Sequence, residues 1–151
     1  MGFINIFDIP GQAACSARPN VNTSVPAGGA MTTLPLSVWA SRTDSSTFTF
    51  NDNGIKINKT GNYLISAGIY YSTYPAKADY GIYVFDSNGT ELVSTRFFNY
   101  SGYSYVGGVG TPAKIVPVTA GTTIYLKARC VGAAGTVTGT DAATFLTLVK
   151  M

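Results

Sequence analysis

A stretch in the middle of the chain, residues 61–72, alternates between apolar and other positions. A period of two predicts a β-strand with one face in a core. The opposite face is not cleanly polar, because Leu64 and Tyr70 interrupt it. Since an antiparallel strand at the surface normally shows water a more polar face, this second face indicates contact with a partner chain. The positions on the predicted core face are Tyr63, Ile65, Ala67, Ile69 and Tyr71.

Shorter stretches of the same kind follow one another, separated by turn signals such as Asn53-Gly54 and Asn88-Gly89. No window has sustained helical periodicity, and residues 99–110 and 132–139 are predicted as loops. About eight short strands with frequent turns predict an all-β, antiparallel jelly-roll β-sandwich. The expected strands cover residues 34–41, 48–50, 55–57, 61–72, 78–86, 91–98, 114–118, 123–131 and 142–150.

The last expected strand has apolar side chains on both faces. We therefore expect it to be buried on both sides, which in a two-layer sandwich requires a second molecule over the outer face. A closed homo-oligomer is the economical arrangement. One face carries Ala143, Phe145, Val149 and Met151, and the other carries Leu146 and Leu148. The candidate subunit interface consists of Leu64, Tyr70, Leu146 and Leu148.

The first part of the chain, residues 1–32, is predicted as an N-terminal arm that precedes a head at residues 33–151. Residues 11–31 are rich in Ala, Asn, Ser, Thr, Pro and Gly, a composition that does not form its own core. Two interpretations stay open: an edge strand folded back on the domain, or a docking peptide that adds a strand or plug to a neighbouring protein. The candidate anchor residues are Phe3, Ile4, Ile6, Phe7 and Ile9.

Composition favours an assembly over a nucleic-acid or membrane protein. Charged residues make up only 11% of the chain, against about a quarter in ordinary soluble domains. The net charge of +3 includes no basic run, whereas nucleic-acid binding favours clustered Lys and Arg. No segment is long and apolar enough to cross a bilayer, and no secretory leader is visible. We expect synthesis in a cytoplasm, no membrane insertion and no nucleic-acid partner.

The residues that usually carry catalysis or bind metals are scarce. The sequence has no His, the commonest general base and metal ligand. Most of its seven carboxylates lie in predicted turns, and Asp79 and Asp86 face opposite sides of one strand. Residues 51–54 are predicted as a plain β-turn rather than a calcium loop. Cys130 is predicted to point into the core, and a disulfide with Cys15 is possible but not indicated. We expect no enzymatic activity, no metal and no cofactor.

One segment, residues 97–105, has the composition of a binding surface. Tyr offers a large rigid contact face with a hydroxyl group, while Ser, Gly and Asn adapt around it. One interpretation is ligand or glycan binding by these tyrosines, and the other is that they line a subunit interface, where aromatic residues are also enriched. The candidate ligand-binding residues are Tyr74, Tyr100, Tyr103 and Tyr105.

Three segments resemble the jelly rolls of the tumour-necrosis-factor (TNF) and complement-globular-head family. Residues 61–70 are similar to its Gly-x-Tyr strand, residues 116–126 to its later pair of strands around an Ala-Gly turn, and residues 145–148 to its final strand. The similarity covers residues 34–151. It implies a compact jelly roll that forms a homotrimer, with the C-terminal strand near the threefold axis.

The members of this family that fit a chain without a visible leader or collagen-like stalk are those of bacteriophage particles and spore coats. We therefore expect a non-enzymatic homotrimeric virion protein, such as a capsid decoration, head fibre or receptor-binding head. Its arm would contact other virion proteins, and its head would lie at the virion surface and contact host-surface glycans. The alternative is a lectin-like glycan-binding module of a bacterial or spore surface.

Overall fold

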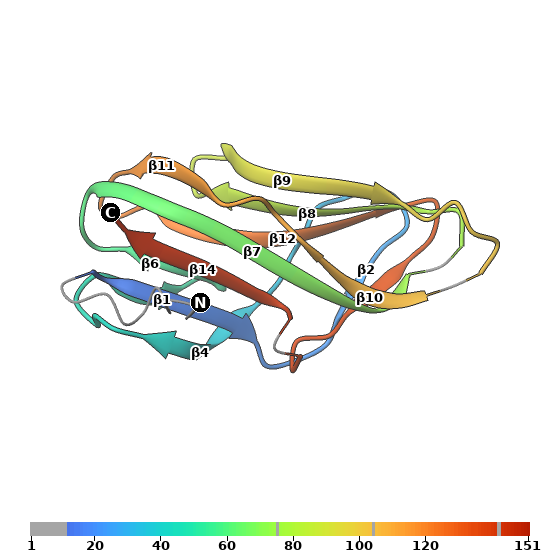
Figure 1. Cartoon of the computed structure of the whole chain (residues 1–151), viewed down its shortest axis with the longest axis horizontal. Helices are drawn as coiled ribbons and strands as arrows, with labels where there is room; N and C mark the ends of the chain where they lie inside the picture. The colour runs from blue at the N-terminus through green and yellow to red at the C-terminus, as the bar shows by residue number, and fades with distance from the viewer. Residues whose placement is uncertain (1–11, 75, 104, 142) are drawn as a thin grey trace, which may run out of the picture.

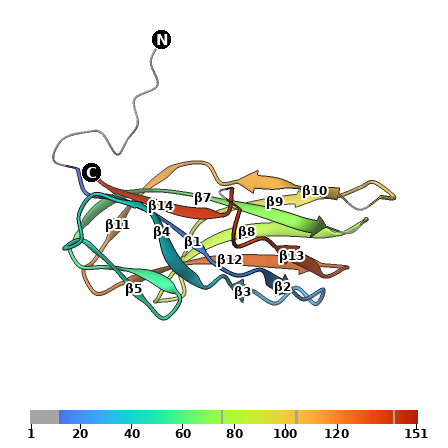
Figure 2. The same cartoon turned by 90° about the horizontal axis from the view of Figure 1, so that it is seen from below.

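The computed structural model describes residues 12–74, 76–103, 105–141 and 143–151, which form two packed antiparallel β-sheets (Figures 1 and 2). The predicted all-β jelly-roll sandwich is confirmed. Within these ranges no helix is long and apolar enough to span a membrane. The strands are β1 (Ala14–Pro19), β2 (Thr23–Val25), β3 (Thr32–Thr33), β4 (Leu36–Arg42), β5 (Phe48–Asn51), β6 (Gly54–Ile57), β7 (Gly61–Tyr74), β8 (Asp79–Asp86), β9 (Glu91–Phe98), β10 (Tyr105–Gly110), β11 (Lys114–Val118), β12 (Thr123–Val131), β13 (Gly135–Val137) and β14 (Phe145–Lys150).

Strand β7 organises the first sheet, whose order is β2-β13-β7-β14-β1-β4. It is 14 residues long, so its two sides pair with four strands. Strands β14 and β13 lie along one side, and β11 and β10 lie along the other. In Figure 1 this green strand runs across the molecule beside the red β14. The second sheet has the order β5-β6-β12-β8-β9, with β3 beside β12.

The core lies between the two sheets, and the predicted inner face of β7 is part of it. The side chains at the odd positions 63–71 are at most 2% exposed. Where Tyr hydroxyls enter this core, they find acceptors: Tyr71 donates to the Gly81 carbonyl at 3.1 Å, and Tyr63 to the Lys59 carbonyl at 2.5 Å. Burial raises the pKa of Tyr63 to about 12. No buried side-chain N or O among the described residues lacks a partner, as expected of a well-formed core.

Two further local predictions are confirmed. The turn between β5 and β6 is a tight hairpin in which Asp52 and Asn53 have φ of 47° and 67°, the backbone that a two-residue hairpin loop requires. Cys130 is buried in the core, and its thiol pKa is raised by burial to about 11. Cys15 is buried as well, and both cysteines are free thiols.

The predicted boundary between an arm and a head at residue 32 is wrong, because, of the two interpretations of the arm, the structure supports a strand folded back on the domain, here as an internal strand. Strand β1 pairs with β14 on one side and with β4 on the other. Its Ala14, Cys15 and Ala17 are fully buried. Small side chains pack closely there but have low β-propensity. The composition of this segment is therefore similar to that of a linker. The sandwich therefore includes residues from Gln12 onward. The anchor candidates Phe3, Ile4, Ile6, Phe7 and Ile9 lie outside the described residues.

The predicted role of Leu146 and Leu148 in a subunit interface is also wrong. The pairing register sets Leu146 opposite Ala67 and Leu148 opposite Ile65, both on the core face of β7. Cross-strand partners share a face, so both leucines point into the sandwich, where they are fully buried. The outer face of β14 is formed by Phe145, Thr147 and Val149.

Two strands occur where loops were predicted. Strand β10 lies within residues 99–110, and β13 lies within residues 132–139. Both are rich in Gly, which weakens the strand signal in a sequence, and both pair with the long β7. Tertiary pairing therefore forms these strands without help from local propensity.

Candidate functional site

The loop that follows β9 presents aromatic side chains to solvent. Tyr100 and Tyr103 are 83% and 76% exposed, and Phe98 at the end of β9 is 42% exposed. The Phe98 and Tyr100 ring centroids are 4.4 Å apart, with the rings tilted by 53°. We call these three side chains the aromatic tip. The loop that follows β9 lies at the end of the sandwich opposite the C terminus (Figure 1).

The backbone beneath the aromatic tip is held by Asn99, a nearly buried residue. Its main-chain N–H donates to the Ala78 carbonyl at 3.0 Å. Its side-chain amide donates to the Tyr103 carbonyl at 3.0 Å and its Oδ1 accepts from the Ser101 N–H at 3.1 Å. The Tyr103 N–H in turn donates to Ser101 Oγ at 3.0 Å. These bonds fix the loop, so the exposed rings are carried on an ordered backbone.

The other two tyrosine candidates lie just behind this loop. Tyr74 and Tyr105 are paired residues at the ends of β7 and β10. The structure therefore brings all four predicted tyrosines to one end of the sandwich, although it describes the side chains of only Tyr100 and Tyr103.

A second feature is a shallow apolar depression on the outer face of the first sheet, where β7, β10 and β14 meet. Its volume is about 200 Å³. Leu64 and Tyr70, predicted to face a partner, lie on this same outer face and are half-buried. Opposite Leu64, the β11 residue Ile115 is 56% exposed. The depression is lined by Gly68, Gly108, Val109, Gly110, Ala143 and Phe145.

The glycines of the depression differ in what they do for the fold. A Cβ on Gly68 would lie 2.7 Å from both the Phe145 ring and the Ala143 carbonyl oxygen, so their close approach requires glycine there. A Cβ on Gly108 or Gly110 would meet no atom closer than 3.5 Å. Within the subunit, nothing therefore requires glycine at these two β10 positions.

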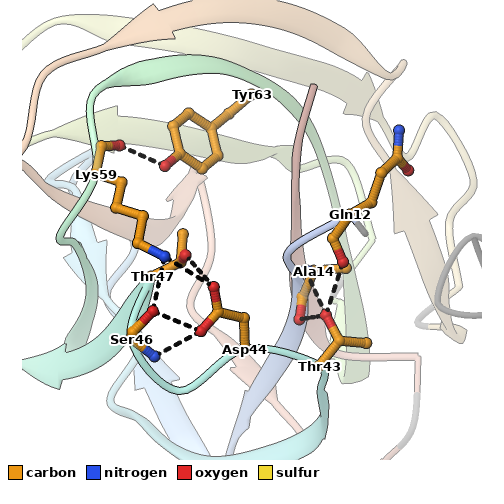
Figure 3. Close-up of polar contacts among 8 residues, drawn as sticks. All are labelled: Gln12, Ala14, Thr43, Asp44, Ser46, Thr47, Lys59 and Tyr63. Carbon is orange, nitrogen blue, oxygen red and sulfur yellow. Dashed lines mark hydrogen bonds and ion pairs between the residues drawn. The ribbon is translucent and has the colours of Figure 1, made fainter. Parts of the chain in front are cut away.

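A third feature is a polar cluster around Asp44, in the loop between β4 and β5 (Figure 3). Asp44 Oδ1 accepts from the main-chain N–H and the hydroxyl of Ser46, each at 2.7 Å. Its Oδ2 accepts from the Thr47 hydroxyl at 2.6 Å and from Lys59 Nζ at 3.1 Å. The Thr47 and Ser46 bonds are the main cause of the lowered pKa of this carboxyl group. The adjacent hollow of about 250 Å³ is lined by Gln12, Ala13, Asp44, Thr47, Lys59, Lys150 and Met151.

The Asp44 cluster has a structural explanation. Next to it, the Ala14 N–H donates to Thr43 Oγ1 at 2.7 Å, so the loop is tied to the start of β1 (Figure 3). Lys59, which binds Asp44, also supplies the carbonyl that holds the Tyr63 hydroxyl. The cluster thus connects the β4–β5 loop, the start of β1 and the turn before β7. The Ser46 hydroxyl donates to Asp44 and accepts from Lys59 Nζ at 2.7 Å, so it is held as part of the same connection.

The Asp44 cluster predicts a specific acid sensitivity. A carboxyl group whose pKa is lowered by folding stabilises the fold above its unfolded pKa, and this contribution is lost as the pH falls through the folded pKa. Asp44→Asn should therefore lower the melting temperature near pH 7, and the difference from wild type should shrink as the pH falls below about 4. The difference in melting temperature between wild type and Asp44→Asn is measured by thermal unfolding of both proteins from neutral pH down to acidic pH. A difference that stays constant with pH would contradict the assignment.

Elsewhere, the described residues contain no group of three or more His, Cys, Asp and Glu side chains that could hold a metal ion. Asp79 and Asp86 lie at opposite ends of β8, and Asp86 accepts the Asn88 and Thr90 N–H groups of its turn. The residues with the strongest geometric case for a function are therefore those of the aromatic tip and the outer-face depression.

Comparison with known proteins identifies solved structures with a similar architecture. Neither the family models nor the curated proteins compared with the sequence give a match. Among solved structures, murine APRIL at pH 5.0 superposes with a TM-score of 0.71 at 16% identity, over 93% of this chain and 99% of that chain. The chain has a TNF-like jelly-roll fold. Eiger TNF from S. frugiperda superposes with a TM-score of 0.63 at 17% identity, over 93% of this chain and 92% of that chain. The TNF-like region extends further towards the N terminus than the predicted residues 34–151, because it includes 93% of the chain.

Several residues of these features were not singled out in the sequence. Phe98 belongs to the aromatic tip, and its position beside the tyrosines was visible, but its exposure was not. Gly68, Gly110 and Phe145 come together only through the pairing of β7 with β10 and β14. The one available signal was glycine inside a strand pattern, which often marks a place where another backbone approaches closely.

Proposed function

We propose that this protein is a non-enzymatic, homotrimeric head with a TNF-like fold, displayed on the surface of a bacteriophage virion as a capsid decoration, head fibre or receptor-binding head. The observation that carries the assembly is the glycine-lined depression on the outer sheet face. The virion setting rests on the resemblance of residues 34–151 to the TNF and complement-globular-head family, which has members on phage particles and spore coats.

The depression favours contact with another copy of the chain for an energetic reason. Glycine inside a strand costs about 0.5–1 kcal/mol relative to alanine, and the subunit itself has no use for Gly108 and Gly110. Close approach by another surface explains both residues. In the described part of the chain β10 pairs only with β7, so it also leaves a sheet edge that an assembly would cover. Half-buried Tyr70 and Phe145 border this surface and would be covered by the same contact.

A threefold assembly is proposed over other closed arrangements because the resembled family implies a homotrimer. A trimer needs one surface patch to contact a different patch on the next subunit, with closure after three steps. The sheet edge at β10 and the outer face of β7 and β14 are two such adjoining patches.

Display on a particle is supported by the positions of the chain ends. Gln12 and Met151 line the same hollow, so the chain enters the sandwich beside its C-terminal strand. The loop that follows β9 lies at the opposite end (Figure 1). An anchor formed by the apolar residues Phe3, Ile4, Ile6, Phe7 and Ile9 would therefore hold the sandwich with the aromatic tip pointing away from the particle.

The assembly is tested by filling the depression. Wild-type protein should have the mass of three chains in light scattering, and Gly108→Glu should have the mass of one chain with an unchanged far-UV circular dichroism spectrum. The fold should tolerate this change, because a Cβ at residue 108 has only ordinary contacts. Thr49→Glu, on an exposed position of β5 opposite Lys56, is the matched control and should stay trimeric. A monomeric wild type would overturn the proposal, and a trimeric Gly108→Glu would place the interface elsewhere.

A second candidate function is a lectin-like module of a bacterial or spore surface. The exposed Tyr100 and Tyr103 favour it, because rigid aromatic side chains on an ordered loop are typical of binding surfaces. It differs from the first proposal in requiring sugar binding and no virion partner.

A further inference from the structure

The aromatic tip has no evident use within the subunit. Single exposed apolar side chains are common on protein surfaces, but here the rings of Phe98 and Tyr100 are in contact and Tyr103 is exposed on the loop that follows. Within the described residues, neither the Tyr100 nor the Tyr103 hydroxyl has a hydrogen-bond partner. Flat apolar faces and available hydroxyl groups are thus presented together to solvent.

The backbone of the loop that carries Tyr100 and Tyr103 is held by hydrogen bonds within the subunit. The hydrogen bonds of Asn99 to the Ala78, Ser101 and Tyr103 main chain order the loop in the free protein. A ligand would therefore meet side chains whose backbone is already fixed, which removes much of the ordering cost of binding. A loop whose only role is to connect β9 with β10 has no need of such a nearly buried amide.

The charged residues near the aromatic tip indicate which classes of ligand it could bind. The sequence has no Asp, Glu, Lys or Arg between Phe97 and Ala113, and the charged residue that the sheet places opposite Phe98 is the acidic Asp79. The guanidinium of Arg96, the nearest preceding charge, donates to the Tyr83 hydroxyl at 2.9 Å. Phosphate-rich or acidic ligands are recognised by Lys and Arg, which this loop lacks. An apolar peptide or helix needs a groove that covers it, whereas the Tyr100 and Tyr103 side chains project into solvent and are mostly exposed.

We propose that Phe98, Tyr100 and Tyr103 form a binding platform for a neutral glycan. A pyranose ring has a face of C–H groups, which carry partial positive charge and fit the electron-rich face of an aromatic ring. Its rim carries hydroxyl groups that can exchange hydrogen bonds with the phenol oxygens of Tyr100 and Tyr103. Neutral sugars thus match both the flat apolar faces and the uncharged polar groups of the tip. The site is complete in one subunit, so it goes beyond the proposed assembly and does not depend on it.

The test uses the full-length protein, biotinylated and clustered on streptavidin, on an array of neutral hexose and N-acetylhexosamine oligosaccharides together with sialylated and sulfated ones. We expect binding to a subset of the neutral oligosaccharides. Tyr103→Ala and Tyr100→Ala should each lower the affinity for the best neutral oligosaccharide, measured by titration calorimetry, by about tenfold or more. Tyr103→Phe keeps the stacking face and should lose less, which separates ring stacking from hydrogen bonding.

Controls distinguish a sugar site from a subunit contact. Met31→Ala changes an exposed apolar residue next to β3 of the second sheet, away from the aromatic tip and from the proposed subunit contact, and should leave binding unchanged. Light scattering of every variant should give the wild-type mass. No binding to neutral sugars, binding only to acidic ones, or binding that survives both Tyr→Ala changes would overturn the proposal. Dissociation of the oligomer by Tyr100→Ala or Tyr103→Ala would also overturn it and assign the tip to an interface, whereas failure of the Gly108→Glu experiment would leave it intact.

Discussion

Deletion of residues 2–31 should abolish the folded state, whereas deletion of residues 2–11 should leave it intact. The longer deletion removes β1, which pairs with β14 and β4 at once, so both strands would be left with unpaired edges. It also removes the fully buried Cys15 and Ala17, and it opens the core beside Leu146 and Leu148. A domain with a net stability of about 5–15 kcal/mol does not survive the loss of an internal strand.

Circular dichroism and thermal unfolding measure this difference. The protein without residues 2–31 should have no cooperative transition, while the protein without residues 2–11 retains every described strand and should melt as the wild type does. The shorter deletion also tests the proposed anchor, because it should give a folded trimer that is missing from purified particles. A cooperative transition in the longer deletion would show that β1 is dispensable, and particles that still carry the shorter protein would refute the anchor.

Leu148→Ala should destabilise the subunit by about 2–5 kcal/mol, the usual cost of replacing a buried leucine. Leu148 is fully buried between Ile65 and Cys15, its partners on β7 and β1, so its removal leaves a cavity inside one chain. Denaturant unfolding at fixed protein concentration measures the change. Leu64→Ala is the control, because Leu64 is only half-buried and lies on the outer face. This change should lower the free energy of unfolding of the subunit by less than Leu148→Ala does.

The two leucine variants also separate core from interface. If Leu148 is a core residue, the folded fraction of Leu148→Ala at low denaturant keeps the oligomeric mass of the wild type. A variant that dissociates into stable monomers would instead return Leu148 to the subunit interface predicted from the sequence.

How far the fold could be predicted depended on how each strand is buried. In β7 one face is wholly apolar, so the period of two identified both the strand and its core face. In β14 both faces are apolar, and periodicity cannot then decide which face is inside. The register of β14 against β7 settles this, and register is a property of two strands rather than one. Strand β10 was not predicted, and β1 was only one of two interpretations of its segment, because small residues pack well but give weak strand signals.

The candidate site was predictable to a similar extent. The Tyr, Ser, Gly and Asn composition of residues 97–105 correctly indicated a loop with exposed tyrosines at positions 100 and 103. The role of Asn99 could not be foreseen, because an Asn in a loop forms many alternative main-chain bonds. The depression was beyond sequence reasoning, since Gly68, Gly108 and Phe145 come from three strands far apart in the chain.

The position of β1 has a mechanical consequence. A pull on the chain ahead of Gln12 would act along the axis of β1, whose hydrogen bonds to β14 and β4 run across that axis on both sides. These bonds would be loaded together in shear, rather than opened one after another as in a strand peeled from a sheet edge. A tether that enters the sandwich through an internal strand thus resists force far better than one attached to a peripheral strand. If the protein is anchored through the chain ahead of Gln12, as proposed above, this attachment would resist mechanical force on the tether.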